Sequence, residues 1–365
     1  MMIAANKPPA FGLGPIHNCY GCCGYGRGPY HKKKLNSRTD QLHLICGSCY
    51  LPKENKEKPL GEDAHFICHD AQTIGVADGV GGWARKGVDA GEYARGLMNH
   101  AKKTATGITR SSAAAVDPRK VLSEAYANNA GVQGSSTACI LSLDKERGTL
   151  HAVNVGDSGF MVFRDNMCFF KSSTQQRSFN CPYQLGNCVG GDCPEAAEEF
   201  EVEELRPGDI IVLGTDGLLD NIFASEIEEV IVAYDVSGQD CEELASYIAN
   251  RALYNSLDKY NVSPFQMEAQ KAGREHVGGK IDDITVVVAR VLASTKNKNK
   301  NIYKKLSIER NTGTTTRAYS LKFQFHIGER HKAFDVPCQN AFLRYTFSCF
   351  RNSANLAKRF LECAT

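Results

Sequence analysis

The chain has 365 residues, of which 42% are hydrophobic and 23% are charged, a composition typical of a globular protein. It contains no run of about 18 uncharged apolar residues, which argues against a membrane-spanning helix. The fifteen cysteines are odd in number and scattered, unlike a secreted disulfide scaffold, so we expect a reducing intracellular compartment.

The formal charge of +2 is very unevenly distributed along the chain. Residues 1–53 have a balance of +6 and residues 296–365 a balance of +10, which leaves −14 for the middle. This pattern predicts three parts. A basic, Cys- and Gly-rich leader of low order occupies 1–53, a folded domain 54–294, and a basic C-terminal extension of low order 295–365.

The leader contains two Cys-x-x-Cys pairs, Cys19/Cys22 (followed by Cys23) and Cys46/Cys49. Their separation is that of a zinc ribbon, but a leader that merely contains cysteines is the favoured interpretation. The segment is basic and poor in acids, which is compatible with an organelle transit peptide.

The middle part alternates short β-branched runs with amphipathic stretches. Strands are predicted at 65–69, 72–77, 136–143, 149–155, 160–163, 167–171, 209–213 and 284–291, and helices at 88–102, 118–130, 225–233 and 240–258. Asp117 and Pro118 mark one helix start, and Ser225 with Glu228 has the capping-box pattern of another. Strands in pairs and helices in pairs predict an α+β fold with antiparallel sheets covered by helices. Beyond it, only a short strand at 319–327 is expected.

Carboxylates stand at the ends of these predicted strands, mostly beside glycine. They are Glu62, Asp63, Asp78, Asp157, Asp216, Asp220, Asp282 and Asp283. One Asp-Gly after a strand is commonly a hairpin turn, but carboxylates that converge in one fold repel each other unless a cation neutralises them. Oxygen ligands without His or Cys indicate Mg²⁺ or Mn²⁺. Two such ions about 4 Å apart can activate a water molecule for attack on a phosphorus atom.

Five motifs occur in order: Gly61-Glu62-Asp63-Ala64-His65, Asp78-Gly79-Val80-Gly81-Gly82-Trp83, Gly156-Asp157-Ser158-Gly159, Thr215-Asp216-Gly217-Leu218-Leu219-Asp220-Asn221 and Asp282-Asp283-Ile284-Thr285-Val286. Together they resemble the metal-dependent protein phosphatases of type 2C, over residues 57–292. The segments 176–185 and 263–280 resemble more closely the type 2C phosphatase seven homologues of mitochondria and plastids. The resemblance makes 54–294 the expected catalytic domain and implies its α+β architecture, a central antiparallel β-sandwich of two sheets flanked by helix pairs on both faces.

The resemblance implies a site for two Mg²⁺ or Mn²⁺ ions, with a weaker third ion in some relatives. Asp78 would bridge the two ions. The implied ligands of the second ion are Glu62 and the Gly79 carbonyl, those of the first are Asp216 and Asp282, and those of the third are Asp157, Asp216 and Asp220.

The resemblance also implies the reaction: a water that bridges the two ions attacks phosphoserine or phosphothreonine of a protein in line, with no covalent enzyme intermediate. Asp63 would orient the water, and Lys58 would attract the substrate phosphate as a point charge. Many relatives have a histidine, the proposed general acid, where this chain has Val80.

A catalytically silent module with the same fold, which would bind phosphoproteins or adaptors, is the main alternative. A third hypothesis treats the basic ends as nucleic-acid-binding arms, although no nucleic acid is expected as a partner. The complete set of carboxylates favours the enzyme. We expect phosphorylated proteins as substrates, a monomer, and a mitochondrial or chloroplast location, with cytoplasm and nucleus as alternatives.

Overall fold

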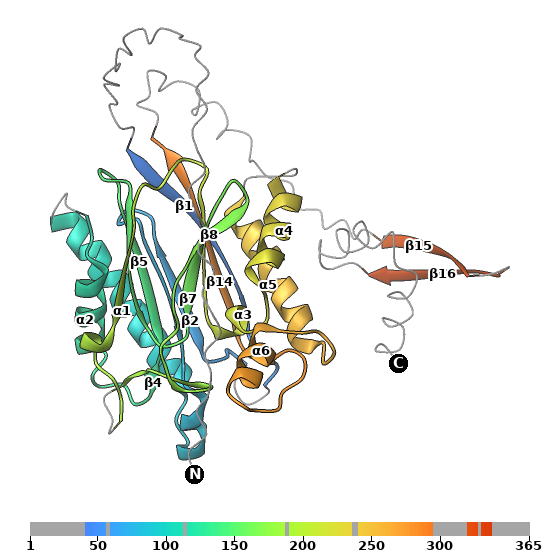
Figure 1. Ribbon diagram of the computed structural model, residues 1–365, viewed down its shortest axis with the longest axis horizontal. Coiled ribbons are helices and arrows are strands. Elements are labelled where there is room, and N and C mark those ends of the chain that lie inside the picture. The colour runs from blue at the N-terminus through green and yellow to red at the C-terminus, as the bar shows by residue number, and fades with distance from the viewer. Residues whose placement is uncertain are drawn as a thin grey trace, which may run out of the picture. The chain divides into compact units, whose positions relative to one another are not determined.

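In the computed structural model, two five-stranded antiparallel sheets lie face to face, with helices on the outside of each (Figure 1). The structure describes residues 41–55, 59–111, 115–186, 190–235 and 240–294, and the backbone of 320–327 and 330–337. The chain divides into two units between residues 296 and 297. The first unit contains the sandwich.

Every strand pair within the two sheets is antiparallel. The first sheet has the order β1 (Leu42–Leu51), β14 (Ile284–Ala293), β13 (Ile210–Gly214), β7 (Gly159–Arg164) and β8 (Met167–Lys171). The second has the order β12 (Glu198–Val202), β6 (Thr149–Val155), β5 (Ala138–Asp144), β3 (Thr73–Asp78) and β2 (Asp63–Cys68). The predicted α+β sandwich is therefore confirmed.

Pairs of helices cover the two outer faces. The helices α1 (Ala90–Ser111) and α2 (Pro118–Asn128) pack on the second sheet, and α4 (Ala224–Asp235) and α5 (Cys241–Leu257) on the first. The remaining elements are short: η1 (Gly81–Lys86), β4 (Ser135–Ser136), β9 (Gln176–Ser178), β10 (Cys181–Pro182), β11 (Leu185–Gly186), η2 (Pro194–Ala196), α3 (Asp216–Leu219) and α6 (Pro264–Lys271).

Three apolar layers alternate with the two sheets. Successive side chains of β5 point to opposite faces, so Ile140 packs towards α1 and α2 while Leu141 packs between the sheets. On β14, Val286 and Val288 face α4 and α5, whereas Val287 faces the other sheet. Both faces of a central strand are thus buried, which is why these strands are continuous apolar runs instead of alternating ones.

The strand β1 lies inside the segment that the sequence analysis placed in the leader. It pairs with the full length of β14, from Leu42 opposite Ala293 to Leu51 opposite Ile284, and α5 packs across it. The folded unit therefore begins before residue 54. Two cysteines, a glycine and a serine interrupt the apolar pattern of β1, so its periodicity is hidden in the sequence.

The Cys46/Cys49 pair lies on this strand, three residues apart, so the two side chains project to opposite faces. Cys46 packs against the core between the sheets, and Cys49 against the core beneath α4 and α5. The two thiols therefore cannot hold one zinc ion together. The other cysteines of the zinc-ribbon hypothesis, Cys19, Cys22 and Cys23, lie outside the described residues.

Helix starts follow the predicted chemistry at α2 but not at α4. Asp117 accepts a hydrogen bond from the Arg119 N–H and caps α2, as predicted. The capping box at Ser225 and Glu228 was wrong, because α4 begins at Ala224 and the Glu226 carboxylate instead accepts the Phe223 N–H at 3.0 Å. Glu228 accepts the Cys168 N–H of the neighbouring strand β8.

The sequence analysis also missed β12 and α6. Three of the five residues of β12 are glutamates, so its charge concealed the strand. In the second unit, β15 (Ser320–Ile327) pairs antiparallel with β16 (Arg330–Pro337), where a single strand was expected. Among the described residues, no helix combines the length and apolar character needed to cross a bilayer.

We predict that β1 contributes directly to the stability of the sandwich. Leu44 is 2% exposed between the sheets, whereas the next residue, Ile45, is 45% exposed. Leu44→Ala should lower the free energy of unfolding by about 2–5 kcal/mol because it leaves a cavity. Urea unfolding measures this loss, and Ile45→Ala is the matched control with a much smaller effect. Equal losses in the two variants would contradict the burial of β1.

Candidate metal centre

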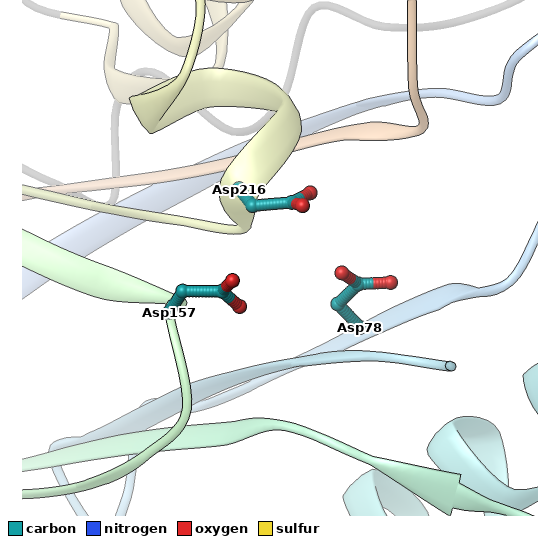
Figure 2. A group of neighbouring side chains, drawn as sticks. All are labelled: Asp78, Asp157 and Asp216. Carbon is teal, nitrogen blue, oxygen red and sulfur yellow. The ribbon is translucent and has the colours of Figure 1, made fainter. Parts of the chain in front are cut away.

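Three aspartates from separate segments converge at one end of the sandwich. Asp78 ends β3, Asp157 follows β6, and Asp216 is the first residue of α3, directly after β13. Figure 2 shows their carboxylates pointing towards one another, and one oxygen from each lies within 4.8 Å of one from the others. The strands β3 and β6 both pair antiparallel with β5 and so run in the same direction, and they end at the same end of the sandwich as β13 of the first sheet.

Glycines let the backbone approach closely around these carboxylates. A Cβ on Gly79 would lie 2.6 Å from the Ala90 carbonyl oxygen and 2.7 Å from that of Glu62. The Gly79 N–H donates a hydrogen bond to the same Glu62 carbonyl at 3.0 Å. Any other residue at position 79 would push β3 away from the start of β2.

Asp63 is buried behind the three converging aspartates, and two threonines hold it. Its Oδ2 atom accepts hydrogen bonds from the hydroxyls of Thr215 at 2.7 Å and Thr285 at 2.8 Å. Its Oδ1 atom is buried and has no hydrogen-bond partner within the described part of the chain. The threonines therefore orient one oxygen and leave the other free.

Glu62, Asp283 and Lys53 form the next part of the site. The two oxygens of Asp283 accept the backbone N–H groups of Glu62, at 2.8 Å, and of Lys53, at 2.7 Å. The Lys53 ammonium lies 2.8 Å from Asp282 Oδ1 and 3.5 Å from Glu62 Oε2. Asp283 thus ties the chain before β2 to the start of β14 and directs Lys53 into the acidic cluster.

Lys280 is a second cation among the carboxylates. Its Nζ atom pairs with Asp216 Oδ2, with Asp220 Oδ2 at 2.9 Å and with Asp282 Oδ2 at 3.5 Å. Both oxygens of Asp282 therefore face a lysine. Asp157 is not paired with either lysine; its Oδ2 atom accepts a hydrogen bond from Gln176 at 2.9 Å.

Burial and mutual repulsion disturb the protonation of the cluster. Burial, followed by repulsion from neighbouring carboxylates, raises the pKa of Asp78 well above its ordinary value. The same two causes raise the pKa of Asp157 to about 7. Burial raises the pKa of Asp220 to about 7, against the attraction of Lys280. For Asp282, the attraction of Lys280 and Lys53 outweighs burial and lowers the pKa.

The donor set fits hard divalent cations. Asp63, Asp157 and Asp216 each have a buried carboxylate oxygen without a hydrogen-bond partner among the described residues. Leaving such an oxygen unsatisfied is costly, and the cluster offers carboxylates without a thiol or imidazole. Mg²⁺ and Mn²⁺ match that ligand chemistry.

The structure thus places the expected metal-site residues at one end of the sandwich. Asp78, Asp157 and Asp216 form the cluster itself. Glu62, Asp220 and Asp282 connect to it through Lys53 and Lys280, and Lys58 lies outside the described residues. Sequence reasoning did not anticipate the roles of Lys53, Lys280 or the Asp283 carboxylate. A signal was present for Lys280, which stands two residues before Asp282.

Comparison with known proteins matches the family described as Stage II sporulation protein E (SpoIIE) to residues 70–292. The chain is 46% identical over 256 residues to "Probable protein phosphatase 2C 55" of Arabidopsis thaliana, covering 70% of this chain and 53% of that protein. It is 43% identical over 284 residues to "Probable protein phosphatase 2C 80" of the same organism. That match covers 78% of this chain and 67% of that protein. The chain thus spans about half the length of the first relative.

Two further similarities extend the comparison. "Protein phosphatase PTC7 homolog fig" of Drosophila virilis is 38% identical over 248 residues, which cover 63% of this chain and 77% of that protein. The solved structure described as "X-ray structure of the photosystem II phosphatase PBCP" superposes with a TM-score of 0.61 at 35% identity, covering 68% of this chain and 98% of that one.

We predict that the metal-free protein loses stability as the pH rises. The ordinary pKa of an aspartate is 3.8, whereas Asp157 and Asp220 in the folded protein have a pKa of about 7 and keep their protons up to about that pH. The folded state therefore binds more protons than the unfolded chain in this window, and its stability falls between pH 5 and 7.5, by on the order of a few kcal/mol.

Thermal unfolding in EDTA across that range measures the effect. Saturating Mn²⁺ should abolish the fall, because the bound ions favour the ionised carboxylates. A melting temperature in EDTA that stays constant or increases from pH 5 to 7.5 would contradict the electrostatic account of the cluster.

Proposed function

Because this chain belongs to the protein phosphatase 2C family, we propose that it is a metal-dependent protein serine/threonine phosphatase. The observation that carries this proposal is the convergence of Asp78, Asp157 and Asp216 within 4.8 Å, with buried carboxylate oxygens that lack partners among the described residues. A module that only bound phosphoproteins would have no need for such a costly arrangement.

We infer a site for two Mg²⁺ or Mn²⁺ ions. Asp78 would be a ligand of both ions, Asp216 and Asp282 would hold one, and Glu62 with the Gly79 carbonyl would hold the other. When bound, the ions supply Lewis acidity, lower the pKa of a water molecule and neutralise charge on the phosphoryl group. The Asp216 Oδ1 atom supports this assignment, since it is buried and unpartnered while Oδ2 pairs with Lys280.

Asp63 positions the attacking water. The hydroxyls of Thr215 and Thr285 fix its Oδ2 atom, so Oδ1 is the atom available to accept a hydrogen bond from that water. Burial raises the pKa of Asp63 well above its ordinary value, against the hydrogen bond from Thr215. A carboxylate with a raised pKa can also take up the proton that the water releases.

The proposed substrates are proteins that carry phosphoserine or phosphothreonine, with Lys58 attracting the phosphate. The solved structure that is described as a photosystem II phosphatase is 35% identical to this chain. Together with the seven basic residues and one acid in residues 1–53, this supports a chloroplast or mitochondrial location for the present chain. A monomer is the proposed state.

Hydrolysis of a phosphothreonine peptide tests the proposal. We expect turnover with Mn²⁺, its loss in EDTA, and a fall in kcat of about 1,000-fold or more in Asp78→Asn, since removing a bridging ligand weakens both ion sites. Asp70→Asn is the matched control, because Asp70 lies in the exposed turn between β2 and β3. A wild-type protein that binds Mn²⁺ without turnover would support the silent module instead.

A further inference from the structure

The side chain of Lys280 lies inside the carboxylate cluster, with only 16% of it exposed. Three carboxylates surround its ammonium group, which has three N–H donors. The partners are Asp216 Oδ2, Asp220 Oδ2 at 2.9 Å and Asp282 Oδ2 at 3.5 Å. The donors and the surrounding acceptors are thus matched in number.

The backbone of Lys280 is fixed by a fully buried side chain. Asn221 Oδ1 accepts the Lys280 N–H at 2.8 Å, and Asn221 Nδ2 donates to the Lys280 carbonyl at 2.8 Å. Asn221 directly follows Asp220, so the same turn that supplies a carboxylate also anchors the lysine that neutralises it. The position of Lys280 is therefore built into the fold.

An aromatic ring fixes the other end of the side chain. The ammonium lies 5.1 Å from the centroid of Phe265, a cation–π contact. Phe265 lies between two other rings. Its ring centroid is 4.9 Å from that of Phe179, in the turn that joins β9 and β10, and 4.7 Å from that of His276. The charge of Lys280 thus contacts an aromatic ring as well as the carboxylates.

This arrangement affects where cations can bind. A third divalent ion at Asp216 and Asp220 would need the Oδ2 atoms that the ammonium already contacts, and it would lie within a few ångströms of a positive charge. In contrast, the free oxygens of Asp157 and Asp216 are their Oδ1 atoms, which Lys280 does not contact. The lysine therefore closes one cation position and leaves the neighbouring position open.

We propose that the Lys280 ammonium is a permanent cation of the site, which takes the place of a third divalent ion at Asp216 and Asp220, so that this chain binds two divalent ions and no third. The inference rests on the proposed function, since it assumes that the cluster binds divalent ions. It replaces the weaker third ion that the family resemblance implies with a residue of the chain itself.

Counting bound Mn²⁺ tests the proposal without an activity assay. Equilibrium dialysis of the full chain, with free Mn²⁺ measured by electron paramagnetic resonance, should give two ions for the wild type. Lys280→Met keeps an unbranched side chain but removes the charge, and should bind a third ion at least about tenfold more tightly than the wild type does. Adding Asp220→Asn to this variant should remove the gain.

Two variants serve as controls. Lys271→Met removes an exposed lysine of α6 that pairs only with Glu268 within the same helix, and should still bind two ions. Lys280→Arg keeps the positive charge and should also bind two. Circular dichroism in EDTA establishes that each variant is folded, and Mn²⁺ should raise the melting temperature of Lys280→Met more than that of the wild type.

The outcomes separate the inference from the proposed function. A wild type that binds three ions, or a Lys280→Met variant that binds two with unchanged affinity, would overturn the role of Lys280 while leaving the phosphatase proposal intact. A wild type that binds fewer than two ions would contradict the proposed function and the inference with it.

Discussion

Repulsion among carboxylates at one end of the β-sandwich is the constraint on which the rest of this structure depends. Five aspartates, Asp63, Asp78, Asp157, Asp220 and Asp283, have raised pKa values, with burial as the largest cause. A fold can tolerate such a cluster only if the scaffold is rigid and cations are available. The two sheets, with helices on both outer faces, supply the rigidity, and Lys53 and Lys280 supply part of the charge.

The scaffold and the site are connected by residues that serve both. Thr285 is part of β14, and Thr215 precedes α3; both hydroxyls hold Asp63 at the start of β2. These contacts join the first sheet to the second directly at the site. The spacing of the carboxylates is therefore set by how the sheets pack, and a change in that packing would alter the cation positions.

Two lysines divide the cluster into regions with different chemistry. Lys53 contacts Asp282, Glu62 and Asp283 on one side, and Lys280 contacts Asp216, Asp220 and Asp282 on the other. The oxygens left without partners among the described residues belong to Asp63, Asp157 and Asp216. A site built in this way selects where ions bind by occupying the alternative position with a charge from the chain.

The α+β class, most of the strands and the aspartates at their ends could be predicted from the sequence, because apolar periodicity and Asp-Gly pairs are local signals, and the ordered motifs added the sandwich through the family resemblance. Strand β1 was not predictable in this way, since its partner β14 lies at the other end of the domain in sequence, whereas the Glu226 cap is a local contact with Phe223 that the pattern at Ser225 and Glu228 obscured. Only the folded structure decided which carboxylates meet, which oxygens remain free and that Lys53 and Lys280 enter the cluster. Those outcomes depend on contacts between segments more than 50 residues apart, which no local pattern encodes.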